Sequence, residues 1–220
     1  MQIELWESAG SMAPLYRELQ ELGLETNIAE LEAFGYTIIA PEKIGPDGYH
    51  LELKGALEQV VHERFGDDMS CWADVNDNLR FLMWDDPVFE KYACNPAGLG
   101  LAQYLLGTNC ILSLCNGWVK GPGEARTGVH SDYLDPTPDA HPVINVNANV
   151  HYFLTDYNKE DGAISFIPGS HRWRRQVSPP ESKYWADRAV PVDARAGSAV
   201  VWGNHTWHGS YPRKTPGVRM

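Results

Sequence analysis

The sequence predicts an α+β fold, in which a mostly helical amino-terminal half packs against a carboxyl-terminal antiparallel sandwich or β-barrel. Up to Gly107, apolar residues recur at the spacing of amphipathic helices. After Gly107, short β-branched or aromatic runs follow one another closely, and turn-forming residues rather than helical patterns separate them. We therefore expect one domain over residues 1–220, with helical support in 1–107 and a β-barrel core in 108–220.

The first helix is predicted between Pro14, which suits a first helical turn, and Gly23, which ends it. Three leucines share its apolar face: Leu15, Leu19 and Leu22. Thr26 or Asn27 can cap a second short helix, and the β-rich run Tyr36–Ile39 follows it.

A longer amphipathic helix is predicted before Gly66, because its apolar residues are three or four positions apart: Leu53, Leu57, Val60, Val61 and Phe65. A further helical segment is capped at Asp85 or Asp86 and runs to Leu106, with a break near Pro96. The strands of the second half are predicted from four short runs: Ile111–Val119, Val143–Leu154, Ala163–Ile167 and Ser198–Trp202.

Composition and charge exclude several classes of protein. The formal net charge of −11 makes a surface that repels nucleic acid and anionic membranes, and the longest apolar run, Leu99–Leu106, is too short to cross a bilayer. The amino terminus shows no secretory signal, and the four cysteines show no Cys-x-x-Cys spacing. We expect neither a zinc site nor a disulfide framework, and we expect a reducing, cytoplasmic setting. The oligomeric state cannot be predicted.

The charge is unevenly distributed, because residues 171–220 hold 9 Lys and Arg against 3 Asp and Glu. Two interpretations stay open. The excess cations either supply a pocket for an anionic ligand or reflect chance beside a solvated acidic face.

The first element that could carry chemistry is His130-Ser131-Asp132. An imidazole and a carboxylate two positions apart on an extended chain lie on the same side and can hold one metal ion. The same pair also arises by chance in a chain with 8 histidines. Alone, it is a weak signal.

Two further elements follow. The segment from Asp161 to Arg172 places a short strand between two turns, which a plain hairpin also explains. The segment from Trp202 to Ser210 brings two histidines, His205 and His208, and Arg219 comes later. A distant histidine would complete a set of two His and one carboxylate, which leaves open positions on Fe(II). An arginine beyond it offers a fixed fork for a carboxylate.

Together these elements resemble the phytanoyl-CoA dioxygenase (PhyH-like) family of Fe(II)- and 2-oxoglutarate-dependent oxygenases. The resemblance rests on five motifs: His130-x-Asp132, Asp161-Gly162-Ala163, Ile167-Pro168-Gly169-Ser170-His171, Trp207-His208-Gly209-Ser210 and Arg219. It covers about residues 105–219, with a fainter echo at Phe34-Gly35-Tyr36. It implies a double-stranded β-helix (jelly-roll, cupin-like) core, with Fe(II), 2-oxoglutarate and O₂ as cofactor and cosubstrates.

Carried over by position, the resemblance implies that His130, Asp132 and His208 bind iron. His205 is the alternative to His208 as the second histidine ligand. Arg219 and Ser210 would bind the distal carboxylate of 2-oxoglutarate. His151 would line the cosubstrate pocket, although a satisfied core histidine is an alternative. A carboxylate at Asp132 implies hydroxylation, desaturation or a related oxidation, since halogenating relatives carry a small residue there.

The substrate side is less defined. The alternation of Asn145, Asn147, Asn149 and His151 with apolar residues predicts a strand whose polar face meets either solvent or the barrel cavity. Asn116 and Trp118 could face the same cavity. We take Asn116, Trp118, Asn147 and Asn149 as candidate substrate residues.

The expected function is oxidation of an unactivated C–H bond of a small-molecule substrate, with release of succinate and CO₂. The substrate could carry an anionic group facing Arg172, Arg174 and Arg175, although these arginines could equally form a solvated rim. The alternative is a cupin-like metal-binding barrel with another activity or a ligand-binding role. His171 is interpreted as structural. The sequence ends at Met220, directly after Arg219, where the family normally continues a barrel strand.

Overall fold

The computed structural model describes residues 12–66, 77–133 and 141–220. Its helices are α2 (Ala13–Glu21), α3 (Glu25–Phe34), α4 (Pro41–Ile44), α5 (Tyr49–Phe65), α6 (Val88–Ala93), α7 (Pro96–Leu106) and α8 (Pro179–Trp185), with 3-10 turns η2 (Leu82–Trp84) and η3 (Ser170–Trp173). Its strands are β1 (Tyr36–Ile39), β2 (Asp77–Leu79), β3 (Gly117–Val119), β4 (Ala148–Tyr152), β5 (Ile164–Phe166), β6 (Val190–Pro191), β7 (Ala199–Gly203) and β8 (His208–Ser210).

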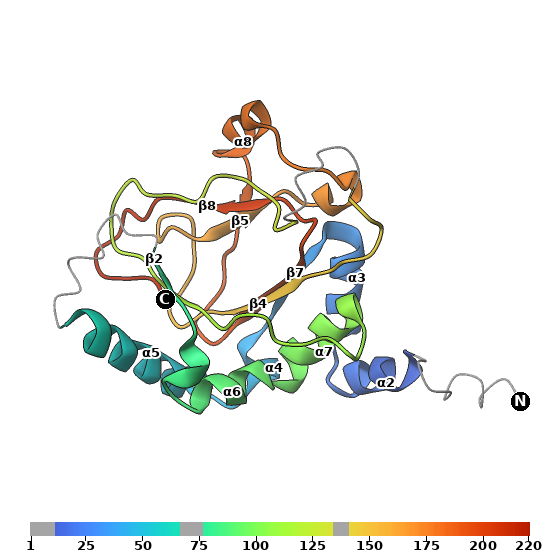
Figure 1. Ribbon diagram of the computed structural model, residues 1–220, viewed down its shortest axis with the longest axis horizontal. Helices are drawn as coiled ribbons and strands as arrows, with labels where there is room; N and C mark the ends of the chain where they lie inside the picture. Colours follow the sequence, from blue (N-terminus) through green and yellow to red (C-terminus); the bar gives the residue numbers. More distant parts are fainter. Residues whose placement is uncertain (1–11, 67–76, 134–140) are drawn as a thin grey trace, which may run out of the picture.

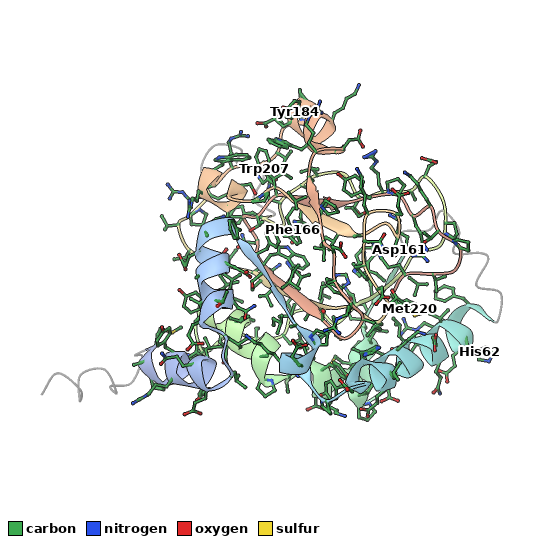
Figure 2. The ribbon with its side chains drawn as sticks, turned by 180° about the vertical axis from the view of Figure 1, so that it is seen from behind. His62, Asp161, Phe166, Tyr184, Trp207 and Met220 are labelled. Carbon is green, nitrogen blue, oxygen red and sulfur yellow. The ribbon has the colours of Figure 1, made fainter. Side chains whose placement is uncertain are left out.

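All strand pairs are antiparallel and form three small sheets, with orders β1-β7-β4, β6-β5-β8 and β2-β3. The first two sheets face each other. Phe166 of β5 packs with Val200 and Trp202 of β7 in one buried cluster, and Figure 2 shows Phe166 in the middle of the molecule. The space between these sheets is therefore the interior of the barrel.

The other face of the β1-β7-β4 sheet is covered by helices, which lie along one side of the molecule in Figure 1. Val201 points away from Val200 and Trp202, as alternation along a strand requires, and packs with apolar residues of α2, α3 and α7. Another cluster joins α5 and α6 to Val119 of β3 and to Met220. The helices thus support the barrel from outside.

Residues 1–107 are predicted to be mostly helical support, with one strand at Tyr36–Ile39, and the described part of this range holds that strand as β1 together with β2, which was not predicted. β1 pairs with β7, and β2 pairs with β3. The helix predictions themselves agree with α2, α3 and α5, and the predicted break near Pro96 separates α6 from α7. Asn95 caps α7, since its side chain accepts from the amides of Ala97 and Gly98.

The predicted cap at Thr26 or Asn27 is wrong. α3 begins earlier, at Glu25, and no side chain caps it. Asn27 lies inside the helix and is buried, because its amide donates to Thr37 Oγ1 (2.8 Å) and Ile38 O (3.0 Å) of β1. Tertiary contact with β1 therefore decides the role of this polar residue.

Two predicted strands are shorter than expected. The run 111–119 forms a strand only at β3, and the run 143–154 only at β4. Ile111 and Val143 are 86% and 76% exposed, so their stretches of chain lack the neighbouring strand that would bury them. β6 and β8 were not predicted as strands; each has only two or three residues. Within the described ranges, no helix is both long and apolar enough to cross a membrane.

Candidate metal centre

The structure brings His130 and His208 together although 78 positions separate them. The two residues exchange backbone hydrogen bonds, with each amide 2.9 Å from the other's carbonyl oxygen. Residues that pair in this way project their side chains to the same face, and the two imidazole rings are 4.3 Å apart between centroids.

Both imidazoles have the same orientation. Nδ1 of His130 lies 2.8 Å from Gly128 O, and Nδ1 of His208 lies 2.9 Å from Thr206 O. A carbonyl oxygen can only accept, so each Nδ1 carries the proton and each Nε2 keeps its lone pair for a metal.

Asp132 completes the group. Its Oδ1 is 3.4 Å from Nε2 of His130, and its Oδ2 is 3.5 Å from Nε2 of His208. One ligand atom from each residue lies within 4.8 Å of the other two. Within the described part of the chain, this is the one cluster of three such side chains that could hold a metal ion.

Two side chains of the β1-β7-β4 sheet hold the Asp132 carboxylate. Nδ2 of Asn149 and Nε1 of Trp202 donate to Oδ2 over 2.9 and 3.2 Å. The backbone amide of Asp132 donates to Asn204 O, which fixes the turn that carries it. Oδ2 is therefore occupied by N–H donors, and Oδ1 is the oxygen that remains for a metal.

The ionisation states of Asp132 and His208 suit metal binding. Burial opposes the charge of Asp132, but His130, His208 and Trp202 outweigh it and lower its pKa to about 2. Burial lowers the pKa of His208 to about 4. Burial also acts against a charged His130, yet the Asp132 carboxylate and Gly128 O raise its pKa overall. Two imidazole nitrogens and one carboxylate oxygen form the donor set typical of non-haem Fe(II) sites.

A missing side chain allows β8 to approach this centre. A Cβ on Gly209 would lie 2.8 Å from Thr127 O, so only glycine fits between His208 and Ser210. The Ile167–His171 motif supports the same strand from the other side. The amide of Ile167 donates to Trp207 O (3.0 Å), and the amide of Trp207 donates to Ser170 Oγ (2.9 Å). The motif thus builds the site without contributing a ligand.

Ser210, Arg219 and Lys120 form a second polar group inside the barrel. Arg219 is only 4% exposed, its guanidinium lies 4.8 Å from the ring centroid of Tyr157, and Nη1 donates to Gly162 O. Nε of Arg219 is buried and has no hydrogen-bond partner among the described residues. A buried guanidinium with an unused donor fits a carboxylate ligand, which the structure itself does not supply.

His151 lies between the two groups. Its Nε2 is 3.1 Å from the Tyr157 hydroxyl, and its pKa is lowered to about 3 chiefly by burial and next by the charge of Arg219. The ring is therefore neutral and close enough to both groups to line the space between them.

The other predicted substrate residues have different positions. Asn149 reaches the metal centre, but through Asp132. Asn147 is exposed, and its backbone carbonyl accepts from the Asn204 amide. Asn116 and Trp118 alternate with Gly117 and Val119, which face the helices, so they face the barrel side. Asn116 Oδ1 is buried without a hydrogen-bond partner in the described chain.

His205 does not join the metal cluster. Its ring packs near Tyr133 and His141, with centroids 5.6 and 5.4 Å away, and its pKa is lowered to about 4 chiefly by burial. His171 packs against Gly35, as a structural role requires.

The predicted anion-binding arginines are mostly engaged elsewhere. Nη2 of Arg172 donates to Glu32 O. Both terminal nitrogens of Arg175 bind Glu181, at 2.8 and 2.6 Å, and its guanidinium lies 4.7 Å from the Trp207 ring centroid. Arg175 therefore anchors α8, which projects from the barrel in Figure 1.

Sequence reasoning missed three residues of the site: Trp202, Lys120 and Gln176. Gln176 binds both sequence neighbours of Asp132. Its Oε1 accepts a hydrogen bond from Ser131 Oγ (3.0 Å), and its Nε2 donates one to Tyr133 O. Lys120 had one available signal, since it falls at the alternating position after Asn116 and Trp118.

Comparisons with known proteins agree with this geometry. The phytanoyl-CoA dioxygenase (PhyH) family model matches residues 53–220, and the chain belongs to this family. Among curated proteins, Dioxygenase af480 of Aspergillus fumigatus is 35% identical over 137 residues, covering 62% of this chain and 43% of the relative. The uncharacterized protein Rv1501 of Mycobacterium tuberculosis is 28% identical over 137 residues, covering 59% and 48%. The matched regions span less than half the length of these relatives.

Solved structures show the same fold. HygX from Streptomyces hygroscopicus, with nickel and 2-oxoglutarate bound, superposes with a TM-score of 0.71 at 14% identity, covering 89% of this chain and 83% of HygX. EctD from S. alaskensis, with 2-oxoglutarate and 5-hydroxyectoine, gives 0.71 at 19% identity, covering 89% and 72%. The two facing antiparallel sheets are thus the jelly-roll of 2-oxoglutarate oxygenases.

Proposed function

We propose that this protein is an Fe(II)- and 2-oxoglutarate-dependent dioxygenase that oxidises a C–H bond of a small molecule. The observation that carries the proposal is the arrangement of His130, Asp132 and His208, with two unprotonated Nε2 atoms and one carboxylate oxygen directed at a common point. When bound there, Fe(II) supplies the O₂ chemistry that couples decarboxylation of 2-oxoglutarate to substrate oxidation.

The position of Ser210 supports 2-oxoglutarate as the cosubstrate. Ser210 follows His208 by two residues on β8, so both side chains project to the same face about 7 Å apart along the strand. That separation suits a five-carbon diacid whose 2-oxo acid end is at the metal and whose far carboxylate is at Ser210 and Arg219. Neutral His151 lines the path between them.

Asp132 also bears on the outcome of the reaction. Its carboxylate occupies a metal position, which leaves no place for a halide beside the two histidines. We infer hydroxylation, desaturation or a related oxidation rather than halogenation. Chlorinated product from the protein with native Asp132 would contradict this inference.

The substrate is proposed only by class. Two structural neighbours were solved with small molecules bound: HygX with hygromycin B, and EctD with 5-hydroxyectoine. Trp118 of β3 and Asn116 just before this strand, both on the barrel side, are the proposed substrate contacts. An anionic group on the substrate, a single domain over 1–220 and a cytoplasmic location stay predictions. The free thiols of Cys94, Cys110 and Cys115 support the last of these.

The function is tested by giving the purified protein Fe(II), ascorbate and 2-oxoglutarate in air and measuring succinate. Many such enzymes turn over slowly without substrate, so we expect succinate that increases with candidate small molecules. His130→Ala should abolish it. Tight Fe(II) binding with no succinate under any condition would instead favour a metal-binding barrel of another function.

A further inference from the structure

Lys120 and Arg219 lie directly opposite each other on neighbouring antiparallel chain segments. The amide of Lys120 is 2.9 Å from Arg219 O, and the amide of Arg219 is 2.8 Å from Lys120 O. Opposed residues project to the same face, and the guanidinium of Arg219 lies over Tyr157 in the barrel core. The Lys120 side chain therefore also enters the barrel.

This pair places two basic side chains next to each other in a buried place. Lys120 is 1% exposed and Arg219 4% exposed, and neither forms an ion pair with a carboxylate of the described chain. Burial and the charges of Arg219 and Arg126 lower the pKa of Lys120 to about 7. Burying an unpaired charge is costly, so two adjacent buried basic groups without a carboxylate partner in the described chain indicate a site built for an anion.

Lys120 also determines what Ser210 can do. Oγ of Ser210 accepts from the amide of Thr127 (2.9 Å) and lies 3.4 Å from Nζ of Lys120. A hydroxyl has two lone pairs and one proton, so with both donors in place its proton is left to donate to a ligand. Nζ of Lys120 donates as well to Tyr211 O (2.7 Å), which leaves one of its three N–H groups.

We propose that Lys120 is a binding residue for the distal carboxylate of a 2-oxo diacid, acting with Arg219, and that it presets the Ser210 hydroxyl as a donor to the same group. This inference rests on the proposed function, because it takes the cosubstrate from there. Lys120 would thus bind the distal carboxylate in addition to Arg219 and Ser210. The ligand carboxylate would also be the partner that this buried lysine lacks in the described chain.

The test compares two cosubstrates on protein loaded anaerobically with Fe(II). 2-Oxoglutarate has the distal carboxylate, and 2-oxobutyrate has the same 2-oxo acid end without it. Lys120→Met keeps the length of the side chain and removes the charge. We expect the variant to bind 2-oxoglutarate about 10-fold or more weakly, since a charge-assisted hydrogen bond is lost, and to bind Fe(II) and 2-oxobutyrate as the native protein does.

The outcomes separate the inference from the proposed function. Absence of 2-oxoglutarate binding to the native Fe(II) protein would overturn the proposed function. Native binding with an unaffected Lys120→Met variant would overturn the inference alone, as would equal weakening of both acids, which indicates only structural damage.

If Lys120→Met does not fold, calorimetry of the native protein at pH 8 in buffers of different ionisation enthalpy replaces it. We expect more proton uptake with 2-oxoglutarate than with 2-oxobutyrate, because the far carboxylate recharges Lys120. Equal uptake with the two acids would overturn the inference.

Discussion

Asn149 and Trp202 are direct cross-strand partners on β4 and β7, and both donate a hydrogen bond to the same oxygen of Asp132. Because the two residues are paired, the Asn149 amide and the Trp202 indole N–H lie next to each other on the inner face of the sheet. The turn that carries Asp132 contacts the sheet at this place. Because both donors bind Oδ2, they orient the carboxylate so that Oδ1 is presented beside the histidines. The sheet register therefore sets the geometry of the metal centre.

Trp202→Phe tests this arrangement, because phenylalanine keeps an aromatic ring against Phe166 and His208 and loses only the N–H donor. We expect Fe(II) or Co(II) affinity to fall roughly 10-fold, the lower end of the effect of such outer hydrogen bonds. Anaerobic metal titration measures it. Trp84→Phe is the control, since Trp84 is 84% exposed. Equal affinities of the two variants would show that the indole N–H does not hold Asp132.

Gly209→Ala should destabilise the protein by about 1–3 kcal/mol, because the new methyl group meets the backbone oxygen of Thr127, which accepts a hydrogen bond from the Ser210 amide. Gly55→Ala in α5 is the matched substitution. Its methyl group meets nothing within 4 Å, and alanine is the better helix former, so we expect stabilisation of about 0.5–1 kcal/mol. Chemical denaturation of both variants decides. Similar stability changes at the two sites would contradict the described packing of β8.

The stability of the cosubstrate-free protein should depend on pH through Lys120. Its pKa is about 7 when folded, against 10.5 ordinarily, so between these values the unfolded chain holds a proton that the folded chain lacks. The free energy of unfolding should therefore rise with pH across this window. Denaturation of the native protein and of Lys120→Met at pH 7 and pH 10 isolates the effect. We expect the native protein to gain relative to the variant, and a constant difference would refute the lowered pKa.

Arg219→Lys should weaken 2-oxoglutarate binding about 10-fold or more, because an ammonium cannot reproduce the guanidinium fork even though the charge is kept. The measurement is the apparent 2-oxoglutarate affinity of the Fe(II) protein. Arg195→Lys serves as the control, since the Arg195 side chain is 78% exposed in an ion pair with Glu42. An unchanged cosubstrate dependence in Arg219→Lys would count against the carboxylate site.

The sequence was sufficient to single out His130, Asp132 and His208, which the structure brings together, because local sequence patterns mark all three. The spacing of His130 and Asp132, and the aromatic-His-Gly-Ser order around His208, can be recognised without knowing the fold. Most helices were also predictable, since apolar residues at helical spacing mark one buried face. The break between α6 and α7 was visible at Pro96.

Residues that act through register could not be predicted. Whether Asn149 faces a substrate or Asp132 depends on how β4 pairs with β7, and no local pattern encodes that pairing. Lys120 looks like any surface lysine until its partner, Arg219, is known. Residues 111–116 and 143–147 were predicted as parts of strands but form none, for a related reason. A strand needs a neighbouring strand to pair with as well as a β-prone sequence.

The central claim is tested most directly by anaerobic titration with Fe(II) and then 2-oxoglutarate, followed through the visible charge-transfer band of the chelated complex. His208→Ala and His205→Ala are the matched variants, since the two histidines are three residues apart and only His208 belongs to the metal cluster. We predict a band in the native protein and in His205→Ala, and none in His208→Ala. No band in the native protein despite tight Fe(II) binding, or loss of the band in His205→Ala alone, would contradict the account.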